Sequence, residues 1–183
     1  MSFELPIVLF CLELLLRSVV EIRERRRTQL RGGIFSIFRL IPLLNDILPL
    51  PESRTPLKED DFVKSHEEGH TAEHHAILRN LVKVLLLMLA VWFFVFLLSS
   101  LGLPLLVATL WLHWVAIPFR IVFHYYCWTQ EYEADRYAFK NVGRQKTKES
   151  MRNLAAHEIP YTSLFALLYR EHPTAHLRKK RLL

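Results

Sequence analysis

The sequence predicts a mostly α-helical, all-α integral membrane protein with two or three transmembrane helices. About half of the 183 residues are hydrophobic (51%), and the mean hydropathy is positive, +0.16. Residues 84–119 contain no Lys, Arg, Asp or Glu, which is enough chain for two bilayer passes of roughly 17–20 residues each. A hairpin that crosses twice returns both of its flanks to one side of the membrane.

The charge supports this topology. The net charge is +6, and none of the 24 Lys and Arg residues falls in the uncharged stretch. Flanking basic residues are expected on the cytoplasmic side, so the positive charge is mainly a topology signal. No basic stripe interleaved with aromatic residues lies outside the apolar segments, so nucleic acid is not an expected partner. The two cysteines, Cys11 and Cys127, form no CxxC motif and are expected to be free, buried thiols.

The N-terminal region, residues 1–31, is expected to be a membrane or interfacial helix. Residues 5–20 are apolar except for Glu13 and Arg17, which can pair at i, i+4 spacing. The basic run in residues 21–27 is then a stop-transfer signal that keeps this end of the helix in the cytoplasm. Whether residues 5–20 cross the membrane fully is left open by their short length.

Residues 32–55 are expected to be an interfacial segment followed by a linker. Gly32 and Gly33 break the chain, and Pro42 and two polar residues interrupt the apolar run that follows. An amphipathic segment at the interface fits this pattern. A short strand at Ile34–Leu40 is the competing interpretation.

Residues 56–183 form the third region, with the transmembrane hairpin at about residues 84–126. A helix is expected to start near Thr55-Pro56, with acidic residues in its first turns, and to run on into the first pass. Gly102 and Pro104 mark the hairpin turn. The second pass continues to a helix end at Gly143, and short helices follow at residues 147–156 and 161–170.

The segment HEEGH, residues 66–70, carries two histidines four residues apart on a predicted helix. Their rings project from one face about one turn apart, close enough to bind one ion. Glu67 stands where HExxH sites have the general base that takes a proton from the metal-activated water. A solvated helix face rich in His and Glu is the alternative interpretation of these five residues.

A zinc site of this kind needs a third protein ligand and an open fourth position. Glu131 begins a helical turn after the second pass, and the two crossings return it to the membrane face that carries His66 and His70. Asp135 follows four residues later on the same helix face, where it can orient a histidine through its second ring nitrogen. These residues predict one Zn²⁺ per chain; the alternative for EYEAD is a charged helix end.

HEEGH, two apolar passes, EYEADRYA and a late His-Pro followed by Arg together resemble the membrane-embedded gluzincin peptidases, the family that includes the HtpX and CAAX prenyl proteases. The resemblance covers roughly residues 56–183. It implies a zincin-like helical catalytic region in which Asp135 supports a ligand histidine. The implied zinc ligands and base are His66, His70, Glu131 and Glu67.

The late motif EHPTAHLR has a counterpart in the same family. The resemblance implies that His172 and Arg178 contact the substrate or help to stabilise the oxyanion. The chain departs from the family pattern at Glu68, where an apolar residue is usual. It also has too few membrane passes for the large chamber of the prenyl protease, which favours a minimal HtpX-like design.

The expected function is therefore that of a zinc-dependent endopeptidase acting on peptide or membrane-protein substrates at the cytoplasmic face of a prokaryotic plasma membrane, with the lipid bilayer as its other partner. A non-catalytic membrane adaptor or regulator that keeps the fold is the alternative. The zinc sensor-proteases of antibiotic-resistance regulation are a further, weaker one. The oligomeric state is not predicted.

Three further histidines need a separate interpretation. His74 and His75 lie one turn beyond the motif and are expected to face solvent or lipid headgroups. His113 lies within the second pass, where an ionisable residue is a functional candidate by default. A neutral histidine hydrogen-bonded to a neighbouring helix is the equally good alternative for His113.

Overall fold

The computed structural model describes residues 4–29, 37–44, 50 and 59–183, and these residues form helices and no strand. Two of the helices are long and apolar enough to cross a membrane. The predicted all-α fold class is thereby confirmed. The contacts divide the chain into two compact units, residues 1–49 with 81–121 and residues 50–80 with 122–183.

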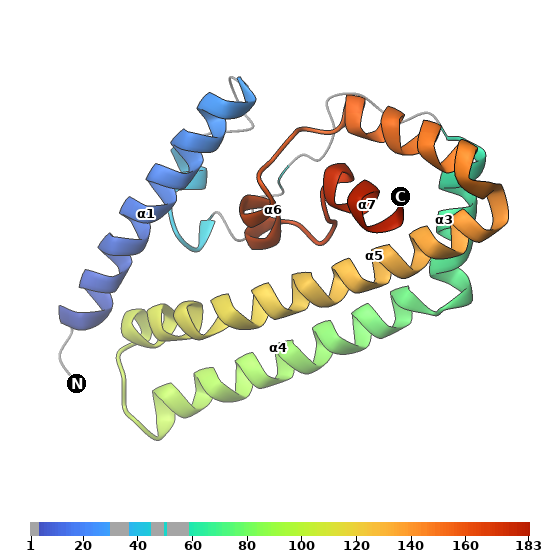
Figure 1. The fold of residues 1–183 in the computed structure, drawn as a ribbon. Helices are drawn as coiled ribbons and strands as arrows, with labels where there is room; N and C mark the ends of the chain where they lie inside the picture. The colour runs from blue at the N-terminus through green and yellow to red at the C-terminus, as the bar shows by residue number, and fades with distance from the viewer. Residues whose placement is uncertain (1–3, 30–36, 45–49, 51–58) are drawn as a thin grey trace. The chain divides into compact units, whose positions relative to one another are not determined.

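The first unit begins with α1 (Glu4–Thr28) and the 3-10 helix η2 (Ile37–Leu40) (Figure 1). The predicted N-terminal helix is confirmed, and it continues through the basic run to Thr28. Its expected internal pair is also present, because Nε of Arg17 donates to Oε1 of Glu13 at 2.6 Å. The alternative of a strand is wrong for Ile37–Leu40, because these residues form a 3-10 helix. Residues 34–36 lie outside the described part of the chain.

Helix α1 has its polar face buried and its apolar face exposed. Glu13, Arg17, Glu21 and Glu24 are buried, and they recur every three or four residues on one face. Large apolar side chains stand exposed on the rest of the helix, among them Leu5, Val8, Leu12, Leu15, Leu16 and Val19. Water would favour the opposite arrangement, so this polarity is typical of a helix that faces lipid.

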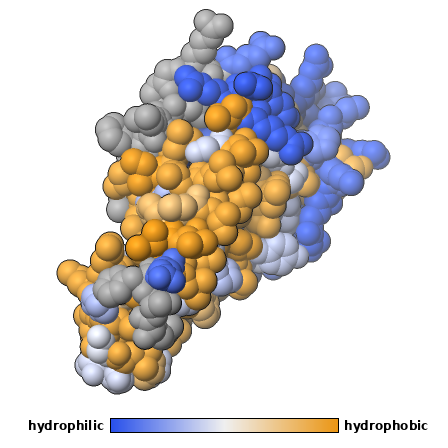
Figure 2. Space-filling model, turned by 90° about the vertical axis from the view of Figure 1, so that its left-hand side faces the viewer, coloured by the Kyte–Doolittle hydropathy of each residue, from blue (hydrophilic) through white to orange (hydrophobic). Residues whose placement is uncertain are grey.

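The apolar hairpin of the first unit consists of the later part of α4 (His75–Ser99) and the first part of α5 (Leu105–His157). The predicted turn lies between them, with Gly102 at a φ of 60°. Leu97, Leu103, Val107 and Ala108 form the small buried core next to this turn. Phe93, Phe94 and Leu98 of α4 are partly buried against this core. Many other large apolar side chains of α4 are exposed, and Figure 2 shows apolar residues over much of the face in view.

The second unit begins with α3 (Asp61–Ala72), which carries the HEEGH segment. Asp60 caps this helix: its Oδ1 accepts from the backbone N–H of Val63 at 2.9 Å. The expected start near Thr55-Pro56 is wrong, because the residues just before Asp61 are not helical; Thr55 and Pro56 themselves lie outside the described part. The acidic side chain that was expected in the first turn serves as the cap.

The expected continuous helix from HEEGH into the first pass is also wrong. Helix α3 ends at Ala72, and α4 starts anew at His75. His74 lies between them with a φ of 55°, a left-handed conformation that ends the helical hydrogen-bond pattern. No glycine or proline marks this break in the sequence.

The rest of the second unit is the later part of α5, then α6 (Ser163–Tyr169) and α7 (Ala175–Leu182). As predicted, α5 is interrupted at Gly143, whose φ is 82°, and a second helical stretch follows to His157. Helix α6 lies within the predicted 161–170 segment. Helix α7 was not predicted; Thr174 caps it by accepting from the backbone N–H of Leu177.

Candidate metal centre

Helices α3 and α5 of the second unit approach closely at Gly69, inside HEEGH. A Cβ atom placed on Gly69 would lie 3.1 Å from Cβ of Tyr137 and 3.2 Å from Cα of Ala134. Ala134 and Ala138, both fully buried, are small residues on the facing side of α5. Glu131 and Asp135 lie on the same side of α5, three residues before Ala134 and Ala138 respectively. The small residues therefore let α3 and α5 pack closely enough for these two carboxylates to reach the side chains of α3.

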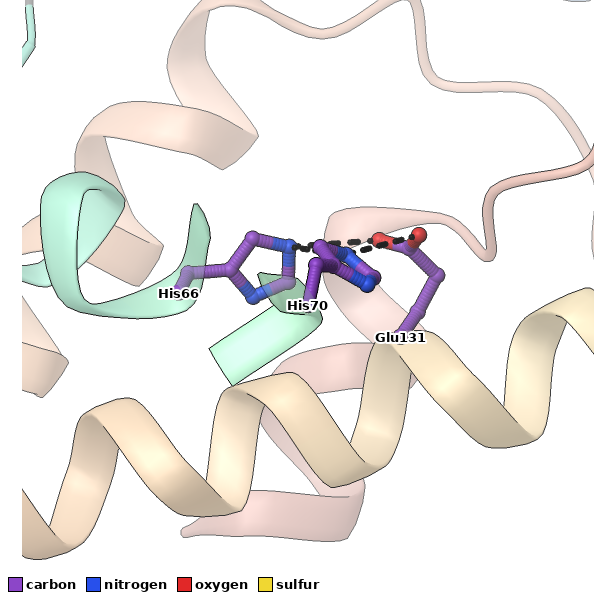
Figure 3. A group of neighbouring side chains, drawn as sticks. All are labelled: His66, His70 and Glu131. Carbon is purple, nitrogen blue, oxygen red and sulfur yellow. Dashed lines mark hydrogen bonds and ion pairs between the residues drawn. The ribbon is translucent and has the colours of Figure 1, made fainter. Parts of the chain in front are cut away.

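The side chains of His66, His70 and Glu131 converge (Figure 3). Their candidate ligand atoms all lie within 4.8 Å of one another. Nε2 of His66 is 3.1 Å from Nε2 of His70 and 3.4 Å from Oε2 of Glu131, while Nε2 of His70 is 3.3 Å from Oε1 of Glu131. Ligand atoms about 2.0–2.2 Å from a tetrahedral zinc ion are about 3.3 Å apart. The three side chains therefore fit three corners of a tetrahedron.

The second ring nitrogen of His66 is held by a buried carboxylate. Nδ1 of His66 lies 3.0 Å from Oδ1 of Asp135, so that Nδ1–H donates and Nε2 keeps its lone pair for a metal. Burial alone lowers the pKa of His66, but the bonds to Asp135 and Glu131 outweigh burial and raise this pKa above 6.5. Asp135 therefore contacts the ring nitrogen of His66 that faces away from His70 and Glu131.

Arg178 binds the other side of the same carboxylate. Its Nε donates to Oδ2 of Asp135 at 2.9 Å, and its Nη2 bonds to Oδ1. Burial tends to raise the pKa of Asp135, but the charge and bonds of Arg178, with the bond to His66, lower it below 3.8. The guanidinium of Arg178 is therefore committed to a residue that supports the ligand set.

The second ring nitrogen of His70 is held by another histidine. Nδ1 of His70 lies 2.8 Å from Nδ1 of His75, whose Nε2 lies 3.2 Å from Oε2 of Glu133. When Nε2 of His70 binds a metal, its Nδ1–H must donate to Nδ1 of His75, and Nε2–H of His75 then donates to Glu133. His75 is only 3% exposed, so the expectation that it faces solvent is wrong, whereas His74 is exposed as expected.

The break at His74 explains this contact. In one continuous helix, residues five positions apart point about 140° away from each other. Because α4 starts in a new direction at His75, the ring of His75 turns back onto His70. The sequence gives one usable signal for this residue: His75 and Arg79 are four apart and share a helix face.

Glu131 is held by two side chains besides His66 and His70. Nη2 of Arg79 lies 2.8 Å from Oε1 of Glu131, and Nδ1 of His172 lies 3.1 Å from the same oxygen. Nε of Arg79 also donates to Oε1 of Gln130 at 2.6 Å. Burial tends to raise the pKa of Glu131, but the bonds to His172, His66 and His70 hold it far below its ordinary value. Arg79 was not predicted as a site residue.

The two carboxylates inside HEEGH are both exposed. Glu67 follows His66 directly on α3, and Glu68 stands beside it. Exposure leaves Glu67 accessible to water and to a substrate, as a general base requires. Exposure of Glu68 also places the unusual acid of this motif in solvent, away from the buried ligand set.

His172 differs from the buried groups around it. Its side chain is 41% exposed while its Nδ1 contacts Glu131. The ring therefore stands at the boundary between the ligand set and solvent. His113, by contrast, belongs to the first unit, where its Nε2 lies 2.8 Å from Oε2 of Glu13. It takes no part in the candidate metal centre.

A model of peptidase family M48 matches residues 43–183, more than half of the chain. No curated protein and no solved structure shows a significant match. The family match includes every residue that was predicted to take part in the site.

Proposed function

Because the chain belongs to peptidase family M48, as its motifs indicated, we propose that it is a zinc-dependent endopeptidase that hydrolyses peptide bonds in protein or peptide substrates. The observation that carries the proposal is the convergence of His66, His70 and Glu131 at the spacing of a tetrahedral site. Two imidazoles and one carboxylate form a donor set that suits zinc and leaves a fourth position open.

In this proposal, His66, His70 and Glu131 would hold the zinc ion, which would supply a Lewis acid that lowers the pKa of a water molecule and polarises the scissile carbonyl. Glu67 accepts a proton from that water as its oxygen attacks the carbonyl carbon. When the C–N bond breaks, Glu67 delivers the proton to the leaving amine nitrogen. The exposed position of Glu67 beside His66 supports this role.

The partly exposed ring of His172 supports a role on the substrate side. It lies next to the ligand Glu131 and can donate a hydrogen bond to the developing oxyanion. Arg178 has a different place in the proposal, because two of its nitrogens bind Asp135. Arg178 acts by holding Asp135, and Asp135 orients His66 for metal binding.

We place this reaction at the cytoplasmic face of a membrane. The exposed apolar residues of α1 and α4 support lipid contact, because monomeric soluble proteins rarely expose large contiguous apolar patches. All basic residues lie outside the uncharged stretch, 84–119, which supports a cytoplasmic position for the site.

The test is a comparison of the purified wild type with Glu67→Gln in a casein cleavage assay, with zinc measured in both. Glu67→Gln is expected to bind stoichiometric zinc and to lose cleavage. Glu68→Gln is the matched control, because it removes the neighbouring exposed carboxylate and is expected to cleave normally. Wild type that holds zinc without any proteolysis would support the non-catalytic adaptor instead, and equal cleavage by Glu67→Gln would refute the mechanism.

A further inference from the structure

A basic groove lies in the second unit, apart from the metal ligands. We define it by the side chains of Arg144, Lys148, Arg152, His176, Lys179 and Lys180. The first three come from the helical stretch after Gly143, and the last three come from α7. The cavity measures about 920 Å³, within the size range of ligand sites, about 300–1,000 Å³.

The cations of this groove lack acidic partners in the described part of the chain. Glu149 is the one acidic side chain in the lining, and it accepts a hydrogen bond from Gln145. Lys146 faces elsewhere and pairs with Asp61, which shows that this stretch can form ion pairs where an acid is within reach. The groove cations remain available for an anionic ligand.

The arrangement costs stability, because like charges repel. Arg144, Lys148 and Arg152 follow one another at i, i+4 spacing on one helix face, which is unfavourable for cations. Folding then brings Lys179 and Lys180 to the same cavity. Long basic side chains offer aliphatic stems as well as charged ends to a ligand. An acidic chain of several residues would find both apolar contact and charge neutralisation there.

The groove and the metal centre share helix α7. Arg178, which binds Asp135 of the metal centre, directly precedes Lys179. Helix α7 has 8 residues and is therefore about 12 Å long. Lys179 and Lys180 of the groove and the arginine that supports Asp135 therefore lie on one short helix, and an extended peptide covers the length of that helix in about four residues, at about 3.3 Å per residue.

We propose that this basic groove binds an acidic segment of the peptide substrate next to the cleavage site. The inference rests on the proposed peptidase function. Lipid headgroups and free phosphate carry negative charge too, but neither offers a chain long enough to follow cations from two helical stretches. The competition experiments below distinguish both from an acidic peptide.

The test measures binding without cleavage. A fluorescein-labelled hexaglutamate peptide and its hexaglutamine counterpart are titrated onto the full chain carrying Glu67→Gln in detergent micelles, and anisotropy is recorded. The hexaglutamate peptide is expected to bind, the hexaglutamine peptide much more weakly, and rising salt should weaken the first. Because no turnover is needed, a failure of peptide binding is distinguishable from a failure of the proposed hydrolysis.

The variant Arg144→Gln/Lys148→Gln/Arg152→Gln is expected to weaken hexaglutamate binding about tenfold, a modest contribution from each exposed charge. The matched control is Arg23→Gln/Arg25→Gln/Arg26→Gln, which removes three exposed cations of α1 and should bind as before. Circular dichroism checks that both variants are folded. Unchanged binding in the groove variant, or equal binding of the two peptides, would overturn the proposal.

Lipid and free phosphate are tested as competitors in the same assay. Mixed micelles containing phosphatidylserine should displace hexaglutamate no better than phosphatidylcholine micelles, and inorganic phosphate no better than chloride of equal ionic strength. Selective displacement by phosphatidylserine would assign the groove to membrane headgroups, and selective displacement by phosphate to a small anion. Either result would overturn the assignment to an acidic peptide.

Discussion

Nη2 of Arg79 lies 2.8 Å from Oε1 of Glu131. A guanidinium from the first turns of α4 therefore forms an ion pair with the carboxylate that completes the ligand set. Glu131 is 1% exposed, and a carboxylate this deeply buried needs a fixed partner. Arg79 and His172 both contact Oε1, and they hold the carboxylate in the orientation in which Oε1 faces His70 and Oε2 faces His66. This relationship makes Arg79 a positioning residue in the proposed enzyme.

Arg79→Gln is expected to weaken zinc binding about 10–100-fold, the usual cost of removing a partner of a ligand. Arg79→Lys should recover part of this loss by restoring a charged donor. Arg136→Gln, which removes an exposed cation of α5, serves as the control. Zinc dissociation constants from chelator competition check the prediction; tighter binding in Arg79→Gln would mean that repulsion between the guanidinium and the metal dominates.

His75→Ala is expected to weaken zinc binding by a similar factor while His74→Ala leaves it unchanged. The reason is that His75 accepts from Nδ1–H of His70 and passes the bond on to Glu133, whereas His74 is exposed. The d–d spectrum of the Co²⁺-substituted protein gives a second readout, because a ligand ring that has rotated changes the coordination geometry. Identical affinities and spectra for the two variants would contradict the assignment.

Gly69→Ala is expected to destabilise the protein and to weaken zinc binding. Its new Cβ would press on Ala134 and Tyr137 at 3.1–3.2 Å. Overpacking costs about 1–3 kcal/mol, which exceeds the gain of about 1 kcal/mol from better helix propensity. Thermal unfolding and zinc titration measure the two effects, and Glu68→Ala is the control on the same helix. A more stable Gly69→Ala variant would show that α5 can shift away.

As the pH is lowered, zinc affinity is expected to begin falling while the pH is still above 6.5. The pKa of His66 is raised above that value in the metal-free site, so a proton competes with the metal as the pH drops through the raised pKa. Protonation of His66 stabilises the folded metal-free protein. This stabilisation is complete below pH 6.5 and is lost as the pH rises through the raised pKa of the folded state.

Asp135→Asn tests this pH dependence, because it keeps an acceptor oxygen but removes the negative charge that helps to raise the pKa of His66. Its zinc affinity should begin to fall at a lower pH than that of the wild type, although it is weaker throughout. Chelator competition at a series of pH values provides the curves. If zinc affinity began to fall at the same pH in both proteins, Asp135 would have no role in setting this pKa.

The sequence alone determined several features because they depend on local pattern. The uncharged stretch predicts the hairpin, Gly102 and Gly143 predict two interruptions, and the i, i+4 histidines of HEEGH predict one shared face. The motif order also identified the family that the match at residues 43–183 confirms. Each of these signals comes from residues that are close together or from composition.

Tertiary structure decided what surrounds those residues. No local sequence pattern predicts the left-handed φ of His74. Without that break, His75 would point away from His70, and Arg79 would lie elsewhere. The placement of Arg178 on Asp135, 43 residues away along the chain, depends on how α7 packs in the second unit. Ligand types follow from sequence because chemistry restricts them, whereas their supporting partners follow from packing between distant segments, which no short pattern encodes.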